Sequence, residues 1–203
     1  MDEPFSAVTP SPGPPGARAR SRVGSALGIA MAVAYPVFVY VGLTHLRARA
    51  VALVMLVGAL AFAALRVRGQ HVRALLGVPI AVCALLAVGA LLDDARLVLA
   101  LPVLVNAVLL ATFGASLRGK TPMVERFARL QKPQLSAAEV RHCRSVTIVW
   151  CVFFVANGAI AGALAIWAPL SWWALWTGAL SYVAMATLFG GEWLVRRARF
   201  GAP

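Results

Sequence analysis

The sequence predicts an all-α helical bundle that spans a membrane, and three observations predict it. The chain of 203 residues is 61% hydrophobic and only 13% charged, so a water-soluble fold of this composition would expose too much apolar surface. The apolar residues form long runs without the two-residue alternation of strands. The basic residues gather between these runs, as topology signals do, and not as a nucleic-acid surface. We therefore expect about six transmembrane helices and no nucleic-acid partner.

The chain divides into a tail, a membrane domain and a short C-terminal tail. Residues 1–22 are rich in proline, glycine and arginine and cannot form a core, so we expect them to be disordered. Residues 23–197 form the predicted membrane domain, and residues 198–203 follow it. The predicted spans are 23–43, 50–67, 74–92, 97–117, 145–168 and 172–195. The second apolar run is short and must borrow flanking residues or thin the bilayer locally.

Three prolines lie within the predicted spans: Pro36, Pro79 and Pro102. Each removes one helical hydrogen bond, so each should kink its helix. Neighbouring helices can satisfy the freed carbonyl groups, and the simplest role of these prolines is to shape the bundle.

The positive charges predict the orientation. With the N-terminus inside, every basic residue except Arg47, Arg49 and Arg96 falls in a cytoplasmic segment. Both termini would then be cytoplasmic, in a bacterial inner membrane whose anionic lipid headgroups contact the inner face. A rival interpretation makes the first apolar run a signal peptide cleaved at Ala48-Arg49-Ala50. Cleavage would leave five spans with the same cytoplasmic charges.

The segment 118–144 is the only long polar connection between predicted spans, and a short amphipathic helix is predicted in it. Thr121 as the N-cap and Pro122 as the first helical residue mark its start, and Pro133 ends it. Its apolar side chains share one face, which would lie on the inner leaflet. They are Met123, Phe127 and Leu130.

A second helix is predicted to begin at a capping box formed by Ser136 and Glu139 and to continue unbroken into the fifth span. Arginines on these two helices would form one basic pocket at the membrane surface, suited to an acidic or phosphate-bearing partner. The four residues are Arg126, Arg129, Arg141 and Arg144. Alternatively, they are stop signals and contacts for lipid headgroups.

Few polar side chains lie at membrane depth. Asn106 and Asn157 lie in the middle of the fourth and fifth spans, and Glu192 lies near the inner end of the sixth. Polar groups in these positions are functional candidates. Two of them also have a structural explanation, because Glu192 precedes Arg196 by four residues and Asn157 precedes a small-residue packing motif that begins at Gly158.

No catalytic motif is recognisable. The three cysteines and three histidines lack metal-ligand spacing, and nothing resembles a Ser/His/Asp arrangement, a phosphate-binding loop or an intramembrane protease dyad. We therefore expect no cofactor and no metal, and we favour a role that is not enzymatic.

Three segments carry a resemblance: TPMVERFARLQKPQLS, EVRHCRSVTIVWCVFFVANG and WALWTGALSYVAMATLFGGEWLVRR, all within residues 118–197. They resemble an uncharacterised family of small bacterial inner-membrane proteins, often encoded near acyl-carrier-protein and ketosynthase genes of aryl-polyene-like or fatty-acid-like pathways. This chain has Thr177-Gly178 where the family has Asn-Gly. The resemblance implies a genomic context and no defined activity. The positions that it marks for testing are Glu125, Arg126, Arg129, Trp150, Asn157 and Glu192.

Three functions follow as hypotheses. The first is docking of an acyl carrier protein or an acyl-lipid pathway enzyme, because the four loop arginines complement an acidic carrier and its phosphopantetheine. The alternative is a small lipid or polyene transporter, with Asn106, Asn157 and Glu192 lining a path. The third is a membrane acyltransferase-like enzyme with Glu192 or His142 as the base.

Overall fold

The structure is a computed structural model that describes residues 34–66 and 77–201, with side chains described for 34–61 and 80–201. The described residues are helical apart from short connections, and no strand occurs among them. The elements are a helix at residues 34–45, α2 (Ala48–Arg66), α3 (Gly77–Leu92), α4 (Ala95–Leu99), α5 (Leu101–Arg118), α6 (Met123–Gln131), α7 (Ala137–Trp167), α8 (Leu170–Leu175), the π-helical segment η2 (Trp176–Leu180) and α9 (Ser181–Phe200). The predicted all-helical fold class is confirmed for this part of the chain.

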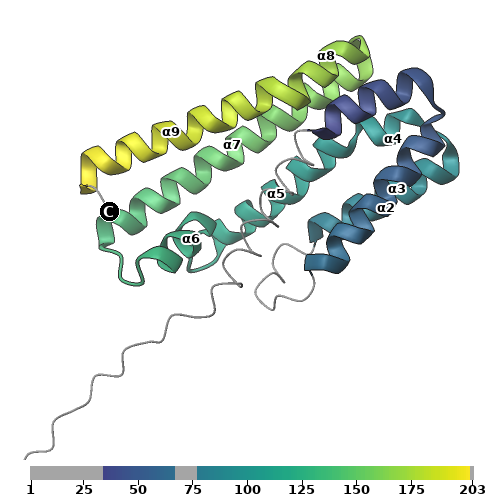
Figure 1. Cartoon of the computed structure of the whole chain (residues 1–203). Helices are drawn as coiled ribbons and strands as arrows, with labels where there is room; N and C mark the ends of the chain where they lie inside the picture. Colours follow the sequence, from purple (N-terminus) through teal and green to yellow (C-terminus); the bar gives the residue numbers. More distant parts are fainter. Residues whose placement is uncertain (1–33, 67–76, 202–203) are drawn as a thin grey trace, which may run out of the picture.

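The long helices run side by side along one direction (Figure 1). α5 packs closely against α7, and the hairpin of α2 and α3 lies beside α5. α6 lies at the end of the bundle where α7 begins and α9 ends, and α4 and α8 lie at the opposite end. We call these two ends the α6 end and the α8 end.

Three helical stretches in the described part are long and apolar enough to cross a membrane. They are Leu101–Arg118, Ala137–Trp167 and Leu170–Phe200, which correspond to the fourth, fifth and sixth predicted spans. Two shorter apolar helices, Ala48–Ala61 and Ile80–Leu92, overlap the second and third predicted spans. The predicted tail, most of the first span and the connection 67–76 lie outside the described residues.

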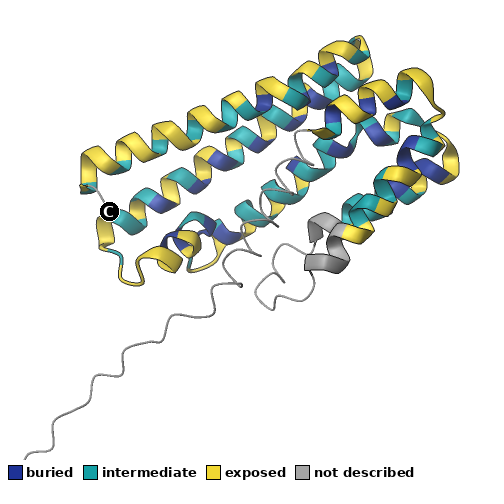
Figure 2. Ribbon diagram, in the orientation of Figure 1, coloured by how far each residue is buried: buried dark blue, intermediate teal, exposed yellow. Residues whose placement is uncertain are grey.

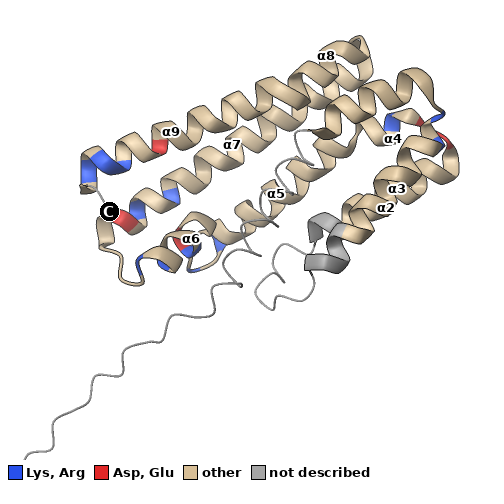
Figure 3. Cartoon of the chain, in the orientation of Figure 1, with Lys and Arg blue, Asp and Glu red and all other residues tan. Residues whose placement is uncertain are grey.

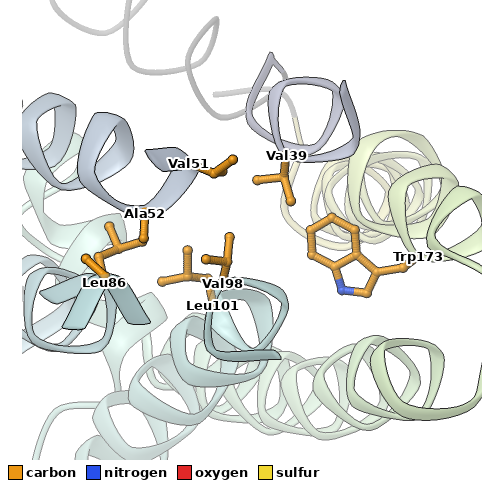
Figure 4. Packing of buried hydrophobic residues seen from close by; sticks show 8 residues of the cluster. Val39, Val51, Ala52, Leu86, Val98, Leu101 and Trp173 are labelled. Atoms are coloured by element: carbon orange, nitrogen blue, oxygen red, sulfur yellow. The ribbon is translucent and has the colours of Figure 1, made fainter. Parts of the chain in front are cut away.

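The largest cluster of buried apolar side chains lies at the α8 end (Figures 2 and 4). It contains Val39, Val51, Ala52, Leu86, Ala90, Val98, Leu101 and Trp173. The indole Nε1 of Trp173 donates a hydrogen bond to the Leu99 carbonyl at 3.2 Å, and Gly42 lies so near Val51 that an added Cβ would be 2.9 Å from its Cγ2. Lipid tails are as apolar as these side chains, so close contact and hydrogen bonds must hold this end together.

Arg49, one of the basic residues on the predicted outer side, forms hydrogen bonds to the end of a neighbouring helix. Its Nε donates to the Ala90 carbonyl at 3.0 Å and its Nη2 to the Leu91 carbonyl at 3.4 Å, which satisfies groups that the end of α3 leaves unpaired. Asp93 adopts a positive φ of 52° just after α3, and its Oδ1 accepts the Arg49 backbone N–H at 2.6 Å. Arg49, which is an exception to the charge pattern, thus links the start of α2 to the end of α3.

The prolines shape the bundle in different ways. The fourth predicted span is divided at Ala100 into α4 and α5, and Pro102 stands in the first turn of α5, where its missing N–H costs nothing. Pro36 forms a contact surface instead, because a Cβ added at Gly178 would lie 3.2 Å from the Pro36 Cβ. The side chain of Pro79 is outside the described set.

The start of α6 differs from the prediction. Thr121 is not its N-cap, because Pro122 occupies that position and offers no capping side chain. The free N–H groups are satisfied from neighbouring helices: Ser116 Oγ accepts from Met123 N at 2.9 Å, and Thr147 Oγ1 accepts from Val124 N at 3.4 Å.

The packed face of α6 also differs from the predicted one. Met123 is buried, but Phe127 and Leu130 are exposed, and Glu125 and Ala128 are buried in their place. Phe127 and Leu130 therefore remain available to contact lipid.

The beginning of α7 agrees with the prediction. Ser136 Oγ accepts from the Glu139 backbone N–H at 3.3 Å, and Glu139 Oε2 accepts from Ser136 N at 2.7 Å. This reciprocal capping box starts a helix that continues without a break to Trp167.

Candidate functional site

A close approach of α5 and α7 brings two asparagines together. A Cβ added at Gly158 would lie 3.1 Å from the Asn106 Cβ, and one added at Gly162 would lie 3.4 Å from Val103 Cγ2. The small-residue motif therefore packs against α5, as the sequence predicts. This contact places Asn157 beside Asn106.

The two side-chain amides form a network that joins three helices. Asn157 Nδ2 donates to Asn106 Oδ1 at 3.2 Å, and Trp176 Nε1 donates to Asn157 Oδ1 at 3.1 Å. Asn106 Nδ2 donates in turn to the Pro102 carbonyl at 2.7 Å. Each amide nitrogen carries two N–H groups and uses one of them in these bonds, so the network retains capacity to donate to a ligand.

Trp176 belongs to the π-helical segment η2, which interrupts the long helix from Leu170 to Phe200. Within it, Thr177 Oγ1 donates to the Trp173 carbonyl at 2.8 Å, and Ser181 Oγ donates to the Thr177 carbonyl at 3.3 Å. A π-helical turn changes the direction of the side chains that follow it and often occurs at functional sites. Here it accompanies the turn of Trp176 toward Asn157.

A cavity of about 420 Å³ lies beside this network. Its walls are mainly aliphatic and aromatic, from α2, α3, α5, α7 and α9. Its polar lining consists of Tyr35, Asn106, Asn157, Thr177, Ser181 and Tyr182. A mostly apolar cavity with a few convergent polar groups is typical of small-molecule sites. We call it the amide pocket.

A second cavity, of about 480 Å³, lies between α5, α6, α7 and α9 toward the α6 end. Phe127, Trp150, Phe189 and Trp193 are among its apolar walls. Its charged lining consists of Glu192, Arg196 and Arg197. We call it the arginine pocket.

Glu192 lies in the arginine pocket and not with the two asparagines. Its Oε1 accepts from Arg196 Nε at 2.9 Å, which confirms the expected pairing. His142 Nε2 lies 3.6 Å from the same oxygen and has no hydrogen-bond partner among the described residues. The three residues predicted to line one path are thus divided between two cavities.

The arginines of the polar connection have different partners. Arg129 Nη2 pairs with the buried Glu125 at 2.6 Å, and Arg126 Nε donates to the Thr121 carbonyl at 3.1 Å. Arg141 lines a small hollow that includes Arg199 of α9, and Arg144 is exposed. The ends of α6, α7 and α9 thereby present basic residues together at the α6 end (Figure 3).

Glu139 is the carboxyl group with the clearest electrostatic perturbation. Lys132 Nζ lies 2.9 Å from its Oε1, and the Ser136 backbone N–H donates to its other oxygen. These contacts, with that of Lys132 the largest, lower the pKa of Glu139 from 4.5 to about 2. The capping box therefore stays ionised throughout the physiological range.

The marked position Trp150 packs among aromatic rings, with ring centroids 4.7 Å from Phe189 and 5.8 Å from Phe154. Sequence patterns did not indicate Tyr35, Trp176, Thr177 or Ser181 as site residues. The only signal in the sequence was Thr177-Gly178, which stands where the family that the chain resembles has Asn-Gly. A π-helical turn has no signature in hydrophobic periodicity, so the sequence offered no way to place these side chains at Asn157.

Comparison with protein families, with curated proteins and with solved structures finds no match to this chain. Among the described residues, no group of three or more His, Cys, Asp or Glu side chains is arranged to hold a metal ion.

Proposed function

We propose that this chain is an integral protein of a bacterial inner membrane, with six spans and both termini in the cytoplasm, and that it binds a lipid-like molecule inside its helical bundle as a small lipid or polyene transporter does. The single observation that carries this proposal is the amide pocket, a largely apolar cavity beside the hydrogen-bonded side chains of Asn106, Asn157 and Trp176.

The charge distribution supports this orientation. Basic residues of α6, α7 and α9 gather at the α6 end (Figure 3), which would be cytoplasmic under the positive-inside rule. Arg49 at the other end is occupied by the carbonyl groups of α3. Its presence on the outer side therefore reflects a structural contact and does not oppose the orientation.

The lining of the amide pocket indicates the class of ligand. A sugar or an ion would require many polar groups to replace its water, whereas this cavity offers few among mainly apolar walls. An elongated hydrocarbon or polyene with one hydrogen-bonding group matches it better, because the walls accept the chain and the amides fix its register.

The test is to purify the full chain in mild detergent from its native membrane and to identify bound lipids by mass spectrometry. Ser181→Phe places a ring in the amide pocket, and Thr187→Phe places the same ring on an exposed position of α9. We expect a specific lipid with wild type and Thr187→Phe and its loss with Ser181→Phe. Equal lipid content in all three proteins would contradict the proposal.

Docking of an acidic partner at the cytoplasmic face is a second proposal, and the basic α6 end supports it. Since Glu125 neutralises Arg129, the contribution comes from arginines without a carboxylate partner among the described residues, which include Arg126, Arg141 and Arg144. An acyl carrier protein, suggested by the resemblance, would bind there in a salt-dependent way.

This second proposal is tested by pull-down with purified acyl carrier protein at low and high salt. Binding to wild type should be lost in Arg141→Ala/Arg144→Ala and kept in Arg47→Ala, which removes a charge from the opposite end. Retention of binding by the double variant would exclude this surface.

A further inference from the structure

The amide pocket and the arginine pocket share a wall. Leu109 of α5, Phe154 of α7 and Met185 of α9 line both cavities. The two hollows are therefore neighbours along the groove between these three helices, with only apolar and flexible side chains at their junction. Methionine changes rotamer easily, so a rotamer change of Met185 is the smallest movement that would open the junction to a hydrocarbon chain.

The far end of the arginine pocket is positively charged. Glu192 neutralises the charge of Arg196, but Arg197 has no carboxylate partner among the described residues. Its guanidinium lies 5.3 Å from the centre of the Trp193 ring, a contact that orients it without removing its charge. The pocket thus combines a net positive mouth with aromatic and aliphatic walls.

The length of the combined cavity suits a single long chain. Ser181 lines the amide pocket and Arg197 lines the arginine pocket, sixteen residues apart on the continuous helix α9. At a rise of 1.5 Å per residue, these positions are separated by about 24 Å. A short anion would fill only the arginine pocket, whereas a single long chain extends through both cavities.

We infer that the two pockets together hold one single-chain amphiphile with an anionic carboxylate or phosphate head. The head lies at Arg197 and the chain passes Leu109, Phe154 and Met185. The distal part of the chain, with the hydrogen-bonding or unsaturated group that it carries, lies beside Asn106 and Asn157. This inference depends on the proposed function and specifies its ligand. In the proposed orientation the head lies at the level of the inner leaflet, from which such a molecule would enter.

Native mass spectrometry of the full chain in detergent tests the inference, with oleate, oleyl alcohol, lysophosphatidic acid and inorganic phosphate as probes. Oleate and lysophosphatidic acid should bind at one molecule per chain, and oleyl alcohol should bind about tenfold more weakly because it lacks the charge-assisted bond. Inorganic phosphate should neither bind measurably nor displace oleate.

Two variants locate the head. Arg197→Gln should weaken oleate about tenfold and leave oleyl alcohol unchanged. Arg199→Gln is the matched control, because Arg199 is on the same helix but lines the hollow near Arg141. Equal loss in both variants would indicate general attraction to a basic surface and would overturn the inference.

Two further variants locate the chain. Met185→Trp should block the junction and abolish oleate binding, whereas Val183→Trp, at a 62% exposed position, should not. Helical content and a monodisperse elution profile establish that each variant is folded. If the folded Met185→Trp variant binds oleate normally, the hydrocarbon chain does not pass the junction and the inference is overturned.

The outcomes separate this inference from the proposed function. If oleate and oleyl alcohol bind equally and Ser181→Phe abolishes the binding of both, the amide pocket binds lipid but the ligand does not need an anionic head. If no probe binds and Ser181→Phe leaves the native lipid content unchanged, both proposals fail. Displacement of oleate by inorganic phosphate would indicate a simple anion site and would also overturn the inference.

Discussion

The two ends of the bundle are formed by different sets of helices and are built differently. At the α8 end, small and branched side chains surround the buried Trp173, and Arg49 and Asp93 complete the helix termini (Figure 4). Toward the α6 end, the arginine pocket opens between α9 and its neighbours. An apolar core thus fills the α8 end, whereas a hollow with a charged lining lies between the helices toward the α6 end. A binding site requires such a hollow beside well-packed supporting side chains.

The largest difference between the ends should appear when a tryptophan is removed from each. Trp173→Ala would leave a cavity in the close-packed end and an unpaired Leu99 carbonyl, at a cost of about 3–5 kcal/mol of stability. Trp193→Ala, at a 51% exposed position, should cost far less. Thermal unfolding in detergent measures both, and equal losses would contradict the comparison.

Substitution of two glycines by alanine should change stability in opposite directions. Gly158→Ala brings a Cβ to 3.1 Å from the Asn106 Cβ, so we expect a loss of about 1–3 kcal/mol and a disturbed amide network. Gly191→Ala meets nothing within 4 Å and should stabilise α9 by about 0.5–1 kcal/mol. Denaturant titration of both variants beside wild type tests the pair. A stabilised Gly158→Ala would indicate that α5 and α7 are not in close contact.

Arg47 and Arg49 should differ in their effect on stability although they are two residues apart. Arg49→Gln removes bonds to two carbonyl groups at the end of α3, so we expect it to cost about 1 kcal/mol. Arg47→Gln has no comparable described contact and should be nearly neutral. Thermal unfolding of the two variants measures this difference. Equal losses would show that stability depends on positive charge in this region and not on the hydrogen bonds of Arg49 to the end of α3.

The smallest effect should come from pH at the capping box of α7. Because the folded pKa of Glu139 is about 2 and its ordinary value is 4.5, its carboxylate stabilises the fold above pH 4.5 and loses this contribution as the pH falls toward 2. The stability difference between wild type and Glu139→Gln should therefore shrink over this interval. A difference that stays constant from pH 6 to pH 2 would contradict the pairing with Lys132 and Ser136.

Several local features could be predicted because they depend on neighbours in the sequence. The capping box at Ser136, the pairing of Glu192 with Arg196 and the packing glycine at Gly158 all follow from spacings of three or four residues. The all-helical class follows from composition and run length alone.

Features that depend on which helices meet could not be predicted. The inward face of α6 is the one with Glu125, because Ser116 and Thr147 on other helices receive its first N–H groups. The four loop arginines were expected to form one pocket, but a partner such as Glu125 is not visible in a spacing pattern until the faces of α6 are assigned.

The amino-acid pattern alone establishes a helical protein with apolar stretches long enough to cross a membrane and with basic residues in the connection between Arg118 and Ala137. The packing of the helices establishes that Asn106, Asn157 and Trp176 form one network, that Glu192 lies in a different cavity, and that the two cavities meet at Phe154. Helix formation depends on residues three or four apart, whereas a pocket is the space left between residues far apart in the chain.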